Sequence, residues 1–249
     1  MFIYYFDFAT ENFKDYIEKY ESFIKFIINN KNNISIIITN WDILLEKYLH
    51  MYGINLDYGF NRPYYLHDRK KIRENLSFIK IHGSTNWFSC ISCNLVMNLD
   101  FEKNENFIYN NSVVEKCSSC KMSAGLKEIQ LHLEIITPTM MKRFNSQLFV
   151  NIWKSAYDEL IVADKIIFIG YSLPMADFDF RYLLKKGART NVKIDVILWK
   201  KDDPKQYNNN KSIIALLPEM RYKSLFIGKD VKFYYDGFTS YFDDLKKIC

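Results

Sequence analysis

The sequence predicts an α/β fold in which a parallel sheet carries helices on both faces. Short continuous runs of β-branched and apolar residues alternate along the chain with longer segments in which apolar residues recur every three or four positions. The short runs have the pattern of strands buried on both sides, and the longer segments that of helices with one apolar face. Strands and helices that alternate in this way are typical of a parallel sheet.

Length and composition agree with one large domain. The chain has 249 residues, of which 49% are hydrophobic and 17% aromatic, and its 34 basic and 29 acidic side chains are well mixed. This composition argues against disorder, and the mixed charge argues against a nucleic-acid partner. No run approaches the roughly 20 apolar residues of a membrane span, and the pattern of a signal peptide is absent. We therefore expect a cytoplasmic protein with no membrane partner.

The first half of the chain contains two pairs of predicted elements. Apolar residues at helical spacing begin at Phe13, and the run Ile34-Ser-Ile-Ile-Ile38 is β-branched and nearly continuous. Glycines and a proline make residues 53–75 irregular. The predicted elements are a helix over 11–28 with Thr10 as its N-cap, a strand over 34–38, a helix from residue 44 and a strand over 78–81.

The second half repeats the alternation after a polar insert of about residues 87–125. The run Lys165-Ile-Ile-Phe-Ile-Gly170 is the strongest strand pattern in the chain. Residues 200–211 have the composition of a surface loop. The predicted elements are strands over 133–137, 165–170 and 192–199, and helices over 149–163, from Asp177 as N-cap, and over 240–248.

Polar residues follow three of the predicted strands. Asn40 and Asp42 follow the strand 34–38, His82 follows 78–81, and Gly170 and Ser172 follow 165–170. In open α/β sheets, ligands bind at the carboxyl ends of the strands. Each residue also has an ordinary explanation: Asn and Asp cap helices, a histidine satisfies a local hydrogen bond, and Gly with Ser forms a strand-to-helix turn.

Four of the five cysteines form two Cys-x-x-Cys pairs. Cys90 and Cys93 are separated by twenty-three residues from Cys117 and Cys120. Two such pairs suit a tetrahedral zinc site, and a shell closed by four thiolates makes the metal structural. The reducing cytoplasm favours metal ligands over disulfides. A redox dithiol, or a site that has lost its metal, is the alternative.

Five motifs, in this order, resemble the SIR2-like proteins of bacteria, relatives of sirtuins of which many serve in phage defence. The resemblance extends over about residues 30–245. The motifs are Thr39-Asn-Trp-Asp42, Lys80-Ile-His-Gly-Ser-Thr-Asn-Trp87, the paired Cys-x-x-Cys, Thr137-Pro-Thr139, and Ile166-Ile-Phe-Ile-Gly-Tyr-Ser-Leu-Pro-Met-Ala-Asp177.

The resemblance implies that residues 1–249 form a Rossmann-like NAD-binding domain, with a zinc-ribbon module inserted at about residues 87–125. Its implied chemistry breaks the bond between nicotinamide and ribose, with NAD and zinc as cofactors. Asn40 would position water or the ribose hydroxyls, and His82 would be the general base. Asp42 would hold the nicotinamide end, Thr39 would also bind the cofactor, and Gly170 and Ser172 would contact the nucleotide.

Two features depart from the family. SIR2-like proteins open with a first strand and a glycine-rich loop that cradles the NAD phosphates, whereas the first glycine here is Gly53. The strand that ends at Leu198-Trp199 also lacks the asparagine often placed near the adenine ribose. We therefore expect Met1 to lie inside the usual domain. Without that loop, NAD affinity falls unless a partner subunit or a second copy of the chain supplies the missing donors.

The leading hypothesis from the sequence is an NAD hydrolase that acts as an anti-phage effector. An NAD-dependent protein deacylase would use the same motifs. A non-catalytic SIR2-like binding or regulatory module is the competing class, and the missing glycine-rich loop favours it. A zinc-ribbon protein that binds nucleic acid is a third hypothesis, which rests on the cysteines and the net charge of +5.

Overall fold

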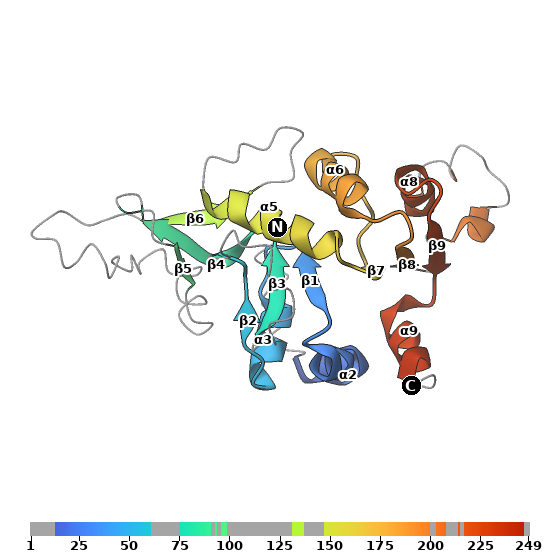
Figure 1. The fold of residues 1–249 in the computed structure, drawn as a ribbon. Coiled ribbons are helices and arrows are strands. Elements are labelled where there is room, and N and C mark those ends of the chain that lie inside the picture. The colour runs from blue at the N-terminus through green and yellow to red at the C-terminus, as the bar shows by residue number, and fades with distance from the viewer. Residues whose placement is uncertain are drawn as a thin grey trace, which may run out of the picture. The chain divides into compact units, whose positions relative to one another are not determined.

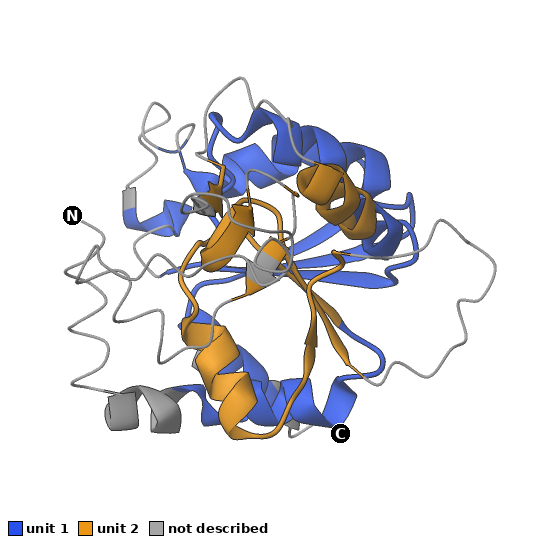
Figure 2. Ribbon diagram, turned by 90° about the vertical axis from the view of Figure 1, so that its left-hand side faces the viewer, with its two compact units in different colours: residues 1–34, 157–249 blue, residues 35–156 orange. Residues whose placement is uncertain are grey.

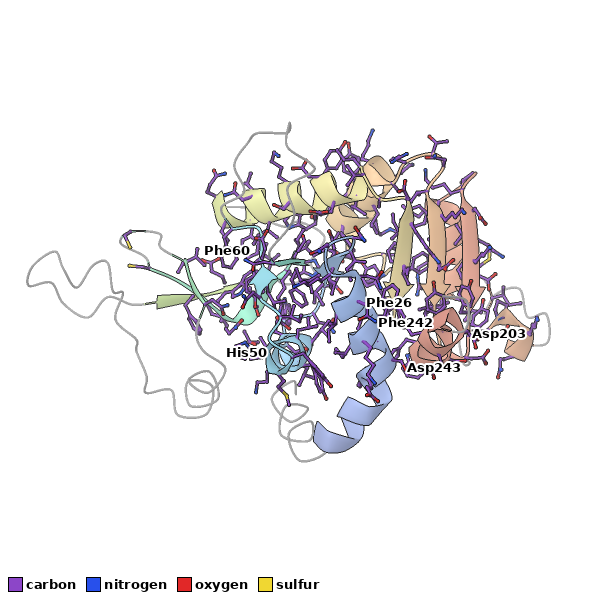
Figure 3. All side chains as sticks on the ribbon, turned by 60° about the horizontal axis from the view of Figure 1, so that its bottom comes forward. Phe26, His50, Phe60, Asp203, Phe242 and Asp243 are labelled. Atoms are coloured by element: carbon purple, nitrogen blue, oxygen red, sulfur yellow. The ribbon has the colours of Figure 1, made fainter. Side chains whose placement is uncertain are left out.

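The computed structural model describes the chain as two compact units (Figure 2). Unit 1 comprises residues 1–34 and 157–249, and unit 2 comprises residues 35–156. The described residues are 13–60, 75–90, 93, 96–98, 131–136, 147–199, 203–207, 214 and 217–246.

Unit 1 is built on a parallel sheet of three strands (Figure 1). Its strands are β7 (Lys165–Ile169), β8 (Lys193–Ile197) and β9 (Asp230–Tyr234), in the order β7-β8-β9. Phe168, Val196 and Phe233 are partners in register, so they point to the same face. The next residues in register, Ile169, Ile197 and Tyr234, point to the opposite face.

Helices cover both faces of this sheet, as predicted. On one face, Tyr222 of α8 (Pro218–Leu225) packs on Phe168, with ring centroids 4.9 Å apart. On the other, Tyr241 of α9 (Gly237–Lys246) packs on Tyr234 at 4.8 Å. The long helix α2 (Phe13–Asn30) lies against α9. Edge-to-face contacts between aromatic rings therefore join the helices to both faces of the sheet in unit 1.

Unit 2 contains a second parallel sheet, in the order β1-β3-β2. Its strands are β1 (Ser35–Ile38), β2 (Leu56–Asp57) and β3 (Leu76–Lys80), and α3 (Leu44–Met51) follows β1. Every residue of β3 is buried, whereas every residue of β1 is only half-buried. The prediction that 34–38 is buried on both faces is therefore wrong. Among the described residues, β1 pairs with β3 alone, so a β-branched run does not establish a central position in the sheet.

An antiparallel sheet completes unit 2, in the order β5-β4-β6. Its strands are β4 (Gly83–Cys90), β5 (Val96–Asn98) and β6 (Leu131–Ile135). The segment predicted as a parallel strand over 133–137 is thus part of an antiparallel pair, since β6 pairs with β4. The strand β4 also runs through the start of the predicted insert. Most residues of the insert predicted as a zinc module lie outside the described residues.

The remaining elements contain both confirmed and missed predictions. The helices α5 (Gln147–Leu160) and α6 (Phe178–Gly187) lie where apolar periodicity predicted them. The sequence did not predict β2, β4, β5, β9, α8 or the short 3₁₀ helix Pro204–Tyr207. Charged residues alternate with apolar ones in β9, and α8 is polar, so neither shows a continuous apolar signal. The expected cap Thr10 lies outside the described residues. None of the described helices is both long and apolar enough to cross a membrane.

Gly83 is the residue at which β3 gives way to β4. Its φ is +82°, and a Cβ there would lie 2.0 Å from the backbone oxygen of Glu134 in β6. Gly53 has a similar φ of +69°, but a Cβ there would meet nothing within 4 Å. Both positions disfavour side chains by conformation, and Gly83 also disfavours them by packing.

The two glycines make a matched test of this packing. A left-handed conformation costs an L-residue about 1–2 kcal/mol, so Gly53→Ala should lower the free energy of unfolding by about that amount. Gly83→Ala should lose clearly more, because the β4–β6 pair must also open. Urea unfolding of the two variants measures the difference. Equal losses would show that β6 does not approach Gly83 this closely.

Candidate functional site

Two predicted motifs lie side by side at the carboxyl ends of β1 and β3. The strands are paired in register from Ser35–Ser77 to Ile38–Lys80. Beyond them, the Ile81 amide donates to the Ile38 carbonyl at 3.1 Å, and the Thr85 amide donates to the Trp41 carbonyl at 3.0 Å. The segment of Thr39–Asp42 therefore runs beside that of His82, as expected for neighbouring parallel strands.

His82 is held in one orientation by a backbone carbonyl. The side chain is 3% exposed, and its Nδ1 lies 3.0 Å from the carbonyl oxygen of Thr39. A carbonyl can only accept, so Nδ1 carries the hydrogen and Nε2 of the neutral ring carries the lone pair. The indole of Trp153 supports this strand end, because its Nε1 donates to the Ile81 carbonyl at 2.9 Å. The Thr39 carbonyl thus fixes the orientation of the ring, and the Trp153 indole fixes the strand end that carries it.

Asn40 and Asp42 differ in their surroundings. Asn40 is exposed, and no hydrogen bond of its side chain with another described residue is found. Asp42 Oδ1 accepts from the Leu44 amide at 3.2 Å, at the start of α3. The ordinary explanation for Asp42, a helix cap, is therefore wrong: the N-cap of α3 is Ile43, which has no side-chain capping bond, and the Asp42 bond is a local turn contact before the helix.

A buried lysine that the sequence reading did not single out lies beneath these loops. Lys80 is 0% exposed, and its Nζ lies 2.6 Å from Glu46 Oε1, 2.5 Å from the Asp42 carbonyl oxygen and 3.3 Å from that of Trp41. Burial lowers the pKa of Lys80 and raises that of Glu46, while the attraction between them opposes both shifts. Three acceptors around one nitrogen match the three N–H groups of an ammonium, so the geometry favours the charged pair.

The third motif, Gly170–Ser172, follows β7 in unit 1. Gly170 has a φ of +65° and donates its amide to the Ile197 carbonyl of β8 at 3.2 Å. Leu173, fully buried, also has a positive φ of 54°, which is rare for a residue with a branched side chain. A backbone held in such a conformation needs support from its surroundings.

Helices α6 and α8 supply that support through three consecutive carbonyls. The carbonyl of Tyr171 accepts from the Tyr222 hydroxyl at 2.7 Å, that of Ser172 from Arg221 Nε at 2.9 Å, and that of Leu173 from Arg181 Nη1 at 3.0 Å. All three carbonyls are therefore engaged by helix side chains, and the Ser172 side chain remains exposed. The structure thus gives this strand end a rigid backbone.

Asp177 is the N-cap residue of α6, as predicted, but its side chain makes no capping hydrogen bond. Its Oδ2 instead accepts from the Tyr171 hydroxyl at 2.7 Å. Burial, together with the Asp177 charge, raises the pKa of Tyr171, so this phenol stays a donor at neutral pH. The tyrosine outcompetes the helix amides for the carboxylate, which the local sequence could not reveal.

The predicted zinc ligands are only half described. Cys90 is the last residue of β4 and is fully buried, and Cys93 is exposed. Cys117 and Cys120 lie outside the described residues. Within the described part of the chain, no three or more His, Cys, Asp or Glu side chains are grouped so that they could hold a metal ion.

The structure thus brings together Thr39, Asp42 and His82 in unit 2 and places Gly170 and Ser172 in unit 1. The functional candidates missed from the sequence are Lys80, Glu46, Arg181 and Arg221. Of these, only Lys80 had a visible signal, a single charge inside an otherwise apolar strand.

No family model and no curated protein matches the chain, whereas solved structures match it in fold. The chain is similar to Sir2 enzymes. One structure, described for the mechanism and regulation of Sir2 enzymes, is 15% identical with a TM-score of 0.40, and the match covers 87% of this chain and 63% of the other. A Sir2 homolog in complex with NAD is 18% identical with a TM-score of 0.37, covering 80% and 60%.

A third structure, Sir2Tm bound to a propionylated peptide, is 16% identical with a TM-score of 0.37, and the match covers 94% of this chain and 81% of the other. The chain spans less than two thirds of the length of the first two structures. All three are described as Sir2 proteins.

Tyr222→Phe tests the support of the Gly170–Leu173 backbone. The variant keeps the ring and removes the hydroxyl that bonds the Tyr171 carbonyl, so the free energy of unfolding should fall by about 1 kcal/mol. Tyr182→Phe on α6 is the matched control, because Tyr182 is 57% exposed, and it should change stability by less than about 0.5 kcal/mol. Chemical denaturation compares them, and equal effects would remove Tyr222 as a support.

Proposed function

We propose that this chain is a SIR2-like, NAD-consuming protein that hydrolyses the bond between nicotinamide and ribose, releasing nicotinamide and ADP-ribose. The observation that carries the proposal is the bond between His82 Nδ1 and the Thr39 carbonyl. It fixes Nδ1 as the donor, so that Nε2 is the nitrogen that can take up a proton, and it places the ring at the carboxyl ends of two parallel strands, where α/β proteins bind their ligands. A role as an anti-phage effector belongs to the same proposal and rests on the motif resemblance alone.

In this mechanism, the residues of unit 2 stabilise and hydrate a positively charged carbon. Cleavage of the glycosidic bond develops oxocarbenium character at the ribose carbon. Asn40 orients the attacking water or the ribose hydroxyls through its exposed amide. His82 accepts the proton of the attacking oxygen at Nε2. Thr39 and Asp42 hold the nicotinamide end.

The nucleotide is assigned to the strand end of Gly170 and Ser172. Tyr222, Arg221 and Arg181 engage the carbonyls of this loop. A loop whose carbonyls are already bonded presents less repulsion to an anionic ligand than one with unpaired acceptors. The Ser172 hydroxyl would then donate to the phosphate or ribose of NAD.

Nicotinamide release tests the proposal directly. His82→Ala should lower kcat by about 10²–10⁴-fold, because the general base is lost. Asn40→Ala should also lower kcat, while its exposed side chain leaves folding intact. His50→Ala and Asn33→Ala are the matched controls, since both side chains are exposed. Thermal unfolding verifies that all four variants fold.

Three outcomes of this assay separate the competing functions. No release by the wild type, with no NAD binding by calorimetry, would replace the hydrolase by a non-catalytic module, which the missing glycine-rich loop favours. Release that depends on an acylated peptide would indicate a deacylase. Equal release by wild type and His82→Ala would remove His82 from the mechanism.

We also propose that Cys90, Cys93, Cys117 and Cys120 bind one structural zinc ion. The support is their spacing, together with the position of Cys90 at the buried end of β4. Zinc bound by four thiolates has no open position, so it would stabilise the segment after β4 without entering the reaction.

Elemental analysis of the purified protein should find one zinc per chain. Cys117→Ser should lose the metal and lower the melting temperature, because metal binding and folding are coupled. Cys249→Ser, outside the two pairs, should keep both. A full zinc content in Cys117→Ser would exclude the four-cysteine site.

A further inference from the structure

We propose that Lys80 is a positioning residue whose ammonium group clamps the backbone carbonyls of Trp41 and Asp42, and so sets the loop that carries Asn40 and Asp42 beside His82. The inference rests on the proposed function, because it assigns a supporting role within that site. Lys80 itself is fully buried and meets no ligand.

Each of the three N–H groups of the Lys80 ammonium has an acceptor. Lys80 Nζ has three acceptors: Glu46 Oε1 at 2.6 Å and the carbonyls of Asp42 and Trp41 at 2.5 and 3.3 Å. Only the ammonium form has three N–H groups to match them. Glu46 is 1% exposed and lies in α3, so the same nitrogen ties the loop to the helix that follows it.

The Trp41 carbonyl also joins the loop to β4 through hydrogen bonds. Besides Lys80, it accepts from the Thr85 amide at 3.0 Å and lies 3.2 Å from the Thr85 hydroxyl, whereas the Ser84 hydroxyl, 3.4 Å away, donates its hydrogen to Asn86 Oδ1 at 2.7 Å. Trp41 lies between Asn40 and Asp42 in the chain. Contacts that fix its carbonyl therefore restrict the backbone of both proposed site residues.

Stability alone does not account for a buried lysine at this position. Apolar side chains in place of a buried ion pair are often neutral or stabilising, since desolvation of the two charges offsets their attraction. An apolar residue at position 80 could fill β3, but it could not donate to the two loop carbonyls. The function specific to the ammonium group is thus the geometry of the loop.

The double variant Lys80→Met/Glu46→Leu separates positioning from stability. It removes both charges, so no unpaired charge remains buried and the melting temperature should stay close to that of the wild type. The kcat for nicotinamide release should fall by about 10–100-fold, because small displacements of site residues slow the reaction strongly. KM should change less than kcat.

Two further variants test whether the effect is specific to the Lys80–Glu46 pair and depends on its charges. Lys165→Met/Asp195→Leu removes an ion pair of unit 1 instead. Its Lys165 Nζ, from the first residue of β7, lies 2.7 Å from Asp195 Oδ2. The kcat of this variant should match the wild type. Glu46→Gln keeps an oxygen acceptor at residue 46 but leaves the Lys80 charge buried without its counter-charge, so its melting temperature should fall well below that of the double variant. An equal melting temperature would show that Lys80 is not held as an ammonium group.

Hydrogen exchange followed by mass spectrometry provides a readout independent of NAD. Peptides that cover residues 39–45 and 83–88 should exchange faster in the Lys80→Met/Glu46→Leu variant, or in Lys80→Met alone, than in the wild type and in the unit 1 control. Unchanged exchange there, or a wild-type kcat in the folded double variant, would overturn the inference. If the wild type releases no nicotinamide but the Lys80 variants still exchange faster than the wild type, the hydrolase is refuted and the clamp is retained.

Discussion

The arrangement of unit 2 depends on one buried ammonium group. Lys80 lies at the end of β3, and its three acceptors belong to the loop after β1 and to α3. A charge in such a place is tolerated only when each of its hydrogen bonds is made, since an unpaired buried charge is strongly destabilising. This requirement couples three segments that are up to 39 positions apart in the chain. The loop with the proposed site residues therefore belongs to the packed interior on one side and faces outward on the other.

The two strand ends are made rigid by different means. In unit 2 the contacts converge on the carbonyls of Thr39, Trp41 and Asp42. In unit 1 the side chains of α6 and α8 engage the carbonyls after Gly170, where Leu173 has a left-handed conformation. Both arrangements use carbonyl acceptors that a strand end would otherwise leave to water. A ligand bound as proposed would therefore meet a preorganised backbone at each strand end, which would lower the entropy lost on binding.

The neighbourhood of His82 and the Thr39–Asp42 loop was predictable from a topological rule. Neighbouring parallel strands present their carboxyl ends at one edge, and both strands are short apolar runs that pattern alone identifies. The partners of Asp177 and Lys80 were not predictable. Asp177 carries the composition of a helix cap, yet Tyr171 takes its carboxylate. The antiparallel pairing of β4 with β6 was also hidden, because the polar insert separates the two strands in the sequence.

The sequence by itself determined the α/β class, the position of most helices and strands, and the motifs that resemble SIR2-like proteins. These features depend on local periodicity and on residue order, which are present in the chain before it folds. Only the tertiary structure decided which nitrogen of His82 carries the hydrogen, which carbonyls the buried Lys80 binds, and why residue 83 must be glycine. Each of these depends on an atom contributed by a distant segment, and the position of such an atom exists only once the segments have packed together.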